Sequence, residues 1–147
     1  MNKHANRPSA AFIAASWCGL LLGAASYLIG LFNAGMQLNE KGYYLALLLF
    51  GLFAAVSLQK SVRDRVEGVA VSGLYYSLAW FALLSALLLL VVGLWNATLM
   101  LSEKGFYGMA YALALFGAVA VQKNTRDLMA ADAAYGEAPL PALPSQE

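Results

Sequence analysis

Long uncharged apolar runs separated by short polar segments dominate this chain. The apolar runs occupy residues 11–32, 43–58, 69–94 and 106–121. A helix rises about 1.5 Å per residue, so roughly 20 residues cross a hydrocarbon core about 30 Å thick. The second run is short for this, and we expect its helix to extend from near Asn39 to beyond Lys60, whose side chain can reach the headgroups. The pattern therefore predicts four membrane-spanning segments.

The composition of these runs favours helices over strands. Leucine, alanine and glycine outnumber β-branched residues, and no alternation of apolar and polar positions is visible. In lipid only helices and closed barrels satisfy every backbone group, and four runs are too few for a barrel. The sequence predicts an all-α integral membrane protein.

An internal repeat divides the chain into two copies of one helical hairpin. Residues 30–64 align with residues 93–127 at an offset of 63 without gaps, and 17 of the 35 positions are identical. Each copy holds two spans, so both enter the membrane in the same orientation and form tandem parallel repeats. We expect a polar leader at residues 1–10, followed by a first hairpin repeat at 11–64 and a cytoplasmic linker at 65–72. A second hairpin repeat at 73–127 and a disordered Pro/Ala-rich tail at 128–147 complete the chain.

Composition supports a membrane location and removes several functions. Hydrophobic residues make up 61% of the chain and charged residues 12%, against roughly 45–50% and 25% in soluble domains. A net charge of +1 gives no basic face for nucleic acid. Cys18 and His4 are the only residues of their kinds, and no nucleotide-binding or hydrolase motif is present. We therefore expect no enzyme activity and no catalytic, cofactor-binding or metal-binding residue.

The basic residues predict the orientation. Of nine lysines and arginines, seven lie at the two termini or between the second and third spans, and only Lys41 and Lys104 lie on the opposite side. Positive charge accumulates in cytoplasmic segments. Both termini of this multi-pass protein are therefore expected in the cytoplasm.

One of two repeated polar motifs, here named the RD box, follows the second and fourth spans. It reads Gln-Lys-x-x-Arg-Asp. Lysine and arginine there suit both a helix C-terminus and the cytoplasmic membrane surface, and Lys pairs with Asp four residues later. Anchoring is the main expectation, and a partner or lipid-headgroup site is the alternative. The residues of the two copies are Gln59, Lys60, Arg63 and Asp64, and Gln122, Lys123, Arg126 and Asp127.

The other motif, the EKG box, reads Gly-Leu-aromatic-Asn-Ala, five residues, then Glu-Lys-Gly-aromatic-Tyr. Adjacent residues on a helix do not face each other, so each glutamate needs a partner other than the next lysine. The repeat suggests a reciprocal clasp, Glu40 with Lys104 and Glu103 with Lys41. A substrate, ion or partner site is the alternative. The residues of the two copies are Asn33, Glu40, Lys41, Gly42 and Tyr44, and Asn96, Glu103, Lys104, Gly105 and Tyr107.

The other residues of the EKG box have structural expectations. The asparagines are expected to cap the ends of the first and third spans, while Asn39 and Ser102 are expected N-caps of the next spans. The glycines would allow close helix approach, and the tyrosines would sit in an interfacial aromatic belt.

A stripe of small residues marks the first span. Ala15, Gly19 and Gly23 recur every four residues, a spacing that lets helices pack closely in lipid. Packing inside the protein is the main expectation, and dimerisation is the alternative.

The paired strings LNEKGYY (38–44) and LWNATLMLSEKGFYG (94–108) resemble the YiaA/YiaB two-helix domain family of bacterial inner-membrane proteins, over residues 11–127. This resemblance implies an inner-membrane location and a two-hairpin unit, and it carries over no catalytic residue. Our functional expectation is a non-enzymatic structural, assembly or stress-related membrane component. Its partners would be the lipid bilayer, with self-association or other membrane proteins. The alternative is a small oligomeric transporter or channel.

Overall fold

Four helices make up the computed structural model, which describes residues 7–136. They are α1 (Ala10–Asn33), α2 (Leu38–Val66), α3 (Gly73–Asn96) and α4 (Leu101–Gly136). Each is long and apolar enough to cross a membrane, and the described residues contain no strand. The predicted all-α architecture with four spans is confirmed. The short second apolar run lies within a 29-residue helix, as expected.

Both first helices of the repeats begin with the same cap. The Ser9 hydroxyl accepts a hydrogen bond from the backbone nitrogen of Phe12, and the Ser72 hydroxyl accepts one from Tyr75, each at 3.2 Å. Ser72 follows Ser9 by 63 positions, the offset of the repeat. The duplication therefore includes the signals that start α1 and α3.

One glycine makes the two second helices differ in length. Gly68 follows the end of α2 with a φ of 79°. Its backbone nitrogen donates to the backbone carbonyl of Arg65, and that of Val69 donates to the backbone carbonyl of Asp64. This is a Schellman ending, which favours glycine. The equivalent position in the second repeat is Ala131, and α4 continues through it to Gly136.

The expected tail boundary is therefore wrong. Residues 128–136 belong to α4, because a helix-forming alanine stands where the first repeat has its terminating glycine. Residues 1–6, with His4, and residues 137–147 of the expected tail lie outside the described residues.

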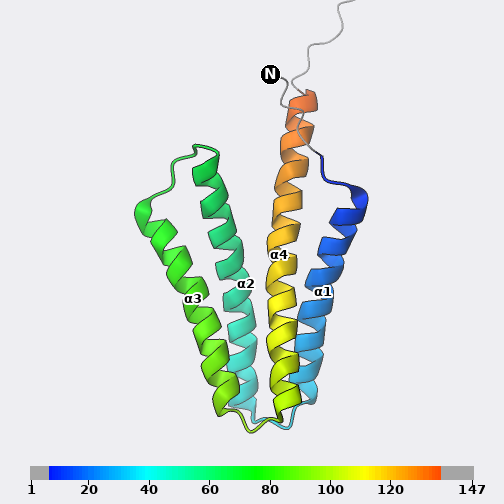
Figure 1. Ribbon diagram of the computed structural model, residues 1–147, viewed down its shortest axis with the longest axis vertical. Coiled ribbons are helices and arrows are strands. Elements are labelled where there is room, and N and C mark those ends of the chain that lie inside the picture. Colours follow the sequence, from blue (N-terminus) through cyan, green and yellow to red (C-terminus); the bar gives the residue numbers. More distant parts are fainter. Residues whose placement is uncertain (1–6, 137–147) are drawn as a thin grey trace, which may run out of the picture.

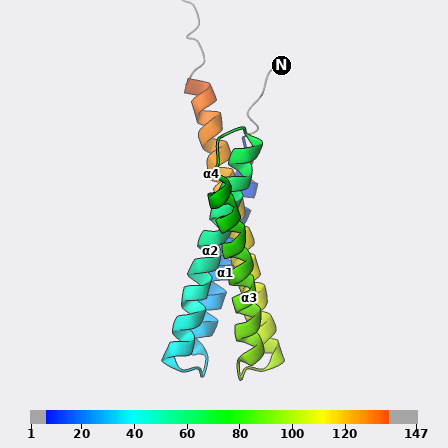
Figure 2. The ribbon, with the colours of Figure 1, turned by 90° about the vertical axis from the view of Figure 1, so that its left-hand side faces the viewer.

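The two hairpins exchange their packing partners. α1 packs mainly on α4 and α3 mainly on α2, while α2 and α4 meet in the centre (Figure 1). The EKG boxes lie together at one end, hereafter the EKG end, and the termini and RD boxes lie at the other, the RD end (Figure 2). Each first helix is thus covered by the second helix of the other repeat, and neither repeat forms a closed unit by itself.

Small residues bring α1 and α4 into backbone contact. A Cβ atom at Gly23 would overlap the backbone of Ala114, and one at Gly117 would overlap the backbone of Leu20. Gly19 faces α4 with more room, 3.8 Å from the Leu113 side chain. The expectation that this stripe serves internal packing is confirmed for its two glycines, whereas Ala15 is exposed.

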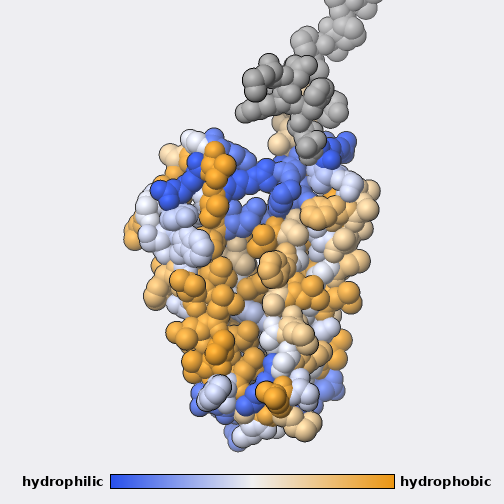
Figure 3. Space-filling model, viewed as in Figure 1, coloured by the Kyte–Doolittle hydropathy of each residue, from blue (hydrophilic) through white to orange (hydrophobic). Residues whose placement is uncertain are grey.

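An apolar belt surrounds the middle of the molecule. Figure 3 shows hydrophobic residues at mid-height and hydrophilic residues gathered at both ends. Large side chains that are mostly exposed in the protein, such as Phe53, Phe81 and Phe116, belong to the spans. This surface is suited to lipid, in which apolar side chains need no protein cover.

We expect Gly23→Ala to destabilise the protein and Gly19→Ala not to. The new methyl at position 23 meets the α4 backbone, and the repacking costs about 1–3 kcal/mol. At position 19 a methyl fits, and replacing glycine within a helix stabilises it by up to about 1 kcal/mol. Thermal unfolding of both variants in the same detergent measures the difference, and equal melting temperatures would contradict the close α1–α4 approach.

Candidate functional site

At the RD end, the two boxes bind each other across the α2–α4 contact. The Arg63 guanidinium donates to the Asp127 carboxylate, and Arg126 lies 2.6 Å from Asp64. The two pairs are related by the offset of 63. Arg63 is 25% exposed and Asp127 17%, so this pairing is partly withdrawn from water. A reciprocal clasp between the repeats therefore exists, but in the RD box.

The lysines of the RD boxes complete this network. Lys60 lies 3.6 Å from Asp64, and Lys123 lies 2.9 Å from Asp127. Both contacts join residues four apart on one helix, so the predicted i,i+4 pairs are confirmed. Each aspartate consequently meets a lysine of its own helix and an arginine of the opposite helix.

Glu67 joins the network without a counterpart in the repeat. Its carboxylate lies 2.7 Å from both Arg63 and Arg126. The hydrogen bond from Arg63, followed by the nearby charge of Arg126, lowers the pKa of Glu67 below its usual range. Position 130, its equivalent in the second repeat, is alanine, so the repeat offers no signal for this residue.

At the EKG end, each glutamate caps its own helix. Glu40 accepts a hydrogen bond from the backbone nitrogen of Gln37 at 2.9 Å, and Glu103 accepts one from Met100 at 2.8 Å. For α2 this hydrogen bond belongs to a capping box, with Gln37 as the N-cap. The expected place of both glutamates in the first turn is confirmed.

The neighbouring lysines reach back to the preceding helix. The Lys41 ammonium donates to the carbonyl of Phe32 at 2.8 Å, and Lys104 donates to the carbonyl of Trp95 at 3.2 Å. Lysine at a helix C-terminus complements the helix dipole. Each Glu-Lys pair therefore closes the loop within its own repeat, and the predicted clasp between Glu40 and Lys104 and its counterpart is wrong. Both lysines donate instead to a carbonyl in the last turn of the preceding helix.

The asparagines of the EKG box also act locally. The amide nitrogens of Asn33 and Asn96 each donate, at 2.8 Å, to the carbonyl four residues earlier. Their expected role as left-handed caps is wrong, because neither adopts that conformation and the C-caps of α1 and α3 are Ala34 and Ala97. Each asparagine is instead the last residue of its helix and binds a carbonyl of the final turns. The expected N-cap role of Asn39 and Ser102 is wrong, because each is the second residue of its helix.

Two further expectations for the EKG box are corrected. Tyr44 and Tyr107 are each only 4% exposed and stack on each other at 6.2 Å between α2 and α4. They belong to the core and not to an interfacial belt. A Cβ at Gly42 or Gly105 would meet no atom within 4 Å, so these glycines mediate no close approach.

The close approach occurs instead at Gly30 and Gly93. A side chain at Gly30 would meet the rings of Phe106 and Tyr107, and one at Gly93 would meet the ring of Tyr43. The first glycine of each EKG box thus makes room for the aromatic pair of the other box. The strict repetition of Gly-Leu-aromatic-Asn carried this signal in the sequence.

Buried tyrosines between the helices escaped sequence reasoning. The Tyr27 hydroxyl donates to the carbonyl of Tyr44, and the Tyr111 hydroxyl to that of Leu47, each at 3.0 Å. Leucines occupy the equivalent positions, Leu90 and Leu48. Since the repeat does not preserve these tyrosines, nothing in the pattern distinguished them from lipid-facing residues.

Gln59 and Gln122 of the RD boxes border two related grooves. The first groove is lined by Gln122, Arg126 and α2 residues that include Lys60. The second groove is lined by Gln59, Arg63 and α3 residues that include Trp80. The side-chain oxygens of both glutamines are buried without a hydrogen bond from the described residues. The ion pairs thus lie at the polar ends of two otherwise apolar surface grooves.

Comparison with known proteins identifies the family. The model of the yiaA/B two helix domain matches residues 12–64 and again residues 75–127. The chain belongs to this family. It is 59% identical to the inner membrane protein YiaA of Escherichia coli (strain K12) over 119 residues, 81% of this chain and 82% of the relative. It is 37% identical to the uncharacterized membrane protein YubF of Bacillus subtilis (strain 168) over 68 residues, 46% of this chain and 78% of the relative.

The comparisons agree with the fold. The two matched domains coincide with the two repeats, so the family unit is one helical hairpin and this chain carries two. No solved structure matches the chain. The similarity to YiaA and the four apolar helices support a multi-pass inner-membrane protein. The described residues contain no group of three or more metal-ligating side chains.

We expect Arg63 and Asp127 to be energetically coupled. In a double-mutant cycle with Arg63→Ala and Asp127→Ala, the coupling free energy should be about 1–2 kcal/mol, because each single change deprives a largely buried charge of its partner on the opposite helix. The cycle of Glu40→Ala and Lys104→Ala is the matched control and should give about 0.3 kcal/mol or less. Unfolding in detergent measures both coupling free energies. A larger coupling between Glu40 and Lys104 would support the clasp that the sequence predicted at the EKG end.

Acid should weaken the RD network through Glu67. Because its pKa is lower in the folded protein than in the unfolded chain, Glu67 contributes stability above the unfolded value of about 4.3, and this contribution disappears as the pH falls through the folded value. The Glu67→Gln variant should therefore lose less stability than the parent between about pH 5 and pH 2. Melting temperatures across this range test the expectation, which parallel curves would contradict.

Proposed function

We propose that this chain is a non-enzymatic component of the inner membrane, with a structural, assembly or stress-related role exercised by binding lipid or other membrane proteins. The supporting observation is how the protein uses its repeated charged groups. At the EKG end they cap helices, and at the RD end they join α2 to α4. The side chains of the EKG end are thus engaged in closing each hairpin, and those of the RD end in holding the two repeats together.

The placement of charge along the spans supports the same proposal. α1 and α3 contain no charged residue, and those of α2 and α4 lie in the first turn or from Lys60 and Lys123 onward. Proton-coupled carriers usually hold an ionisable group within the membrane. The alternative, a small oligomeric transporter or channel, relies on Glu40 and Glu103, which lie at the EKG end.

Native mass spectrometry of the tagged chain, extracted with its surrounding lipid, tests the binding role. We expect species heavier than the 15.7 kDa chain that retain specific lipid or a partner protein under conditions that strip lipid from an unrelated four-span control. If the chain releases all bound lipid and protein as readily as the control does, the proposed binding role is wrong.

Proteoliposomes test the alternative. Cation and dye flux under an imposed proton gradient should not exceed that of empty liposomes, and a known small multidrug carrier serves as the positive control. Flux that disappears in a Glu40→Gln, Glu103→Gln double variant would establish transport instead.

We also propose that the RD end faces the cytoplasm. Seven of the nine basic residues belong to this end by their position along the chain, and cytoplasmic segments accumulate such charge. Reporter fusions after residues 68 and 130 should both give cytoplasmic signals, while a fusion after residue 35 should give a periplasmic one. The inverse set of signals would reverse the orientation.

A further inference from the structure

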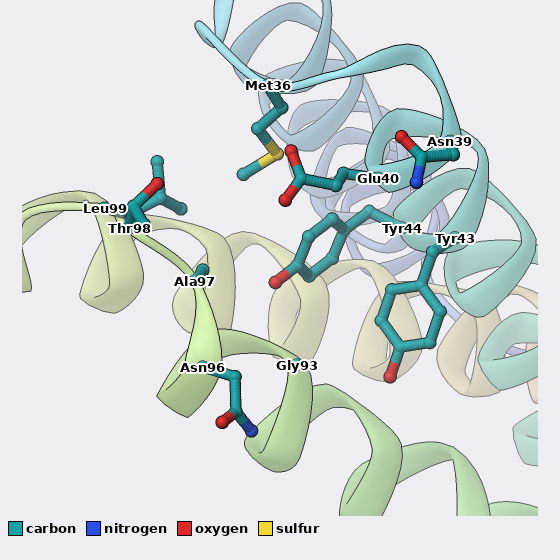
Figure 4. Close-up of a pocket in the computed structure, with 10 residues that line it drawn as sticks. All are labelled: Met36, Asn39, Glu40, Tyr43, Tyr44, Gly93, Asn96, Ala97, Thr98 and Leu99. Atoms are coloured by element: carbon teal, nitrogen blue, oxygen red, sulfur yellow. The ribbon is translucent and has the colours of Figure 1, made fainter.

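A small pocket opens at the EKG end between the first turns of α2 and the last turn of α3. Its volume is about 240 Å³, below the roughly 300–1,000 Å³ of drug-sized sites. Figure 4 shows Glu40, Tyr43 and Tyr44 on one side and Gly93, Asn96 and Ala97 on the other. A ligand here would be small and would enter from the aqueous face.

We propose that this pocket binds a small organic cation of the alkylammonium type. Its one acidic side chain is Glu40, and only one carboxylate oxygen is used, in accepting from Gln37. Within residues 7–136, no donor contacts the other oxygen and no basic side chain forms an ion pair with Glu40. A negative charge therefore stands available at the pocket.

The opposite wall reinforces this charge. Gly93 and Asn96 belong to the last turn of α3, and Ala97 is its C-cap, where backbone carbonyls make the helix end partly negative. Lys41 donates to the carbonyl of Phe32 and Lys104 to that of Trp95, so Lys104 offsets part of the negative charge at the end of α3. Neither lysine lines the pocket, whose lining includes one acidic and no basic side chain. The lining of the pocket thus favours positive over negative ligands.

One fixed aromatic ring, that of the partly exposed Tyr43, gives the pocket its preference for an organic ion, and the buried Tyr44 ring packs behind it. The rings of Tyr43 and Tyr44 stand at 83° with centroids 5.2 Å apart. The Tyr43 hydroxyl donates to the carbonyl of Leu89 at 2.6 Å, while Tyr44 stacks on Tyr107. Preorganised aromatic faces attract alkylammonium groups. Calcium requires six to eight oxygen ligands, and this pocket offers one carboxylate.

The second repeat supplies a matched control. The equivalent glutamate, Glu103, caps α4 as Glu40 caps α2, but phenylalanine and serine replace Tyr43 and Asn39 there, at positions 106 and 102. A glutamine at either glutamate keeps an acceptor oxygen for the cap, since capping boxes accept Glu or Gln. The pair of variants therefore separates loss of a ligand from loss of fold.

The experiment is calorimetric titration of the full chain in nanodiscs with choline, and with its uncharged isostere 3,3-dimethylbutan-1-ol. We expect saturable choline binding and none of the alcohol. Glu40→Gln should weaken choline binding by about tenfold or more, as for loss of a charged partner, whereas Glu103→Gln should leave it within about twofold. Tyr43→Phe, which keeps the ring but loses the bond to Leu89, should weaken binding less than Tyr43→Leu, which removes the ring.

Three results would overturn the proposal. The first is no saturable binding of choline by the folded parent chain. The second is equal binding of the uncharged alcohol, which would make the pocket an apolar crevice. The third is an equal loss in Glu40→Gln and Glu103→Gln, which would assign both effects to helix capping.

Discussion

The contact between α2 and α4 is the interaction on which the rest of this structure depends. α1 packs mainly on α4 and α3 mainly on α2, so the two helix pairs are held together chiefly where α2 meets α4. In lipid no general hydrophobic force drives two helix pairs together, and packing and polar contacts must do so. The Tyr44–Tyr107 stack at one end and the Arg63–Asp127 and Arg126–Asp64 pairs at the other provide both.

The duplication has kept the ends of the hairpin and changed its middle. The EKG and RD boxes recur almost unchanged, because each copy must close its own loop and meet the other copy at the RD end. Between them the copies differ: Asn124 donates to Ser16 across α1 and α4, where the equivalent positions hold Ser61 and Ala79. This hydrogen bond adds a polar contact to the close α1–α4 packing at Gly23 and Gly117.

The use of charge at the two ends differs in physical character. At the EKG end each charged side chain satisfies a backbone group of its own repeat, so these contacts set loop geometry and leave one oxygen of Glu40 available. At the RD end the charges satisfy one another between repeats, so these contacts set the relation of α2 to α4. This difference explains why the adjacent glutamate and lysine of the EKG box form no ion pair between the repeats. Arg63 and Asp64 of the RD box do form such pairs, because their side chains are directed at the opposite helix.

The sequence by itself determined the four spans, their helical character, the parallel repeat and the i,i+4 pairs of the RD box. These follow from local properties: run length, residue type and spacing along one helix. Only the tertiary structure decided which helix covers which, because a repeat of two apolar helices is compatible with packing inside a hairpin or between hairpins. It is the fit of Gly23 against the α4 backbone, and of Gly30 and Gly93 against the aromatic pair of the other repeat, that selects the exchange. Tyr44 is buried and Glu40 borders a pocket as consequences of that exchange, since both depend on the approach of segments more than fifty residues apart.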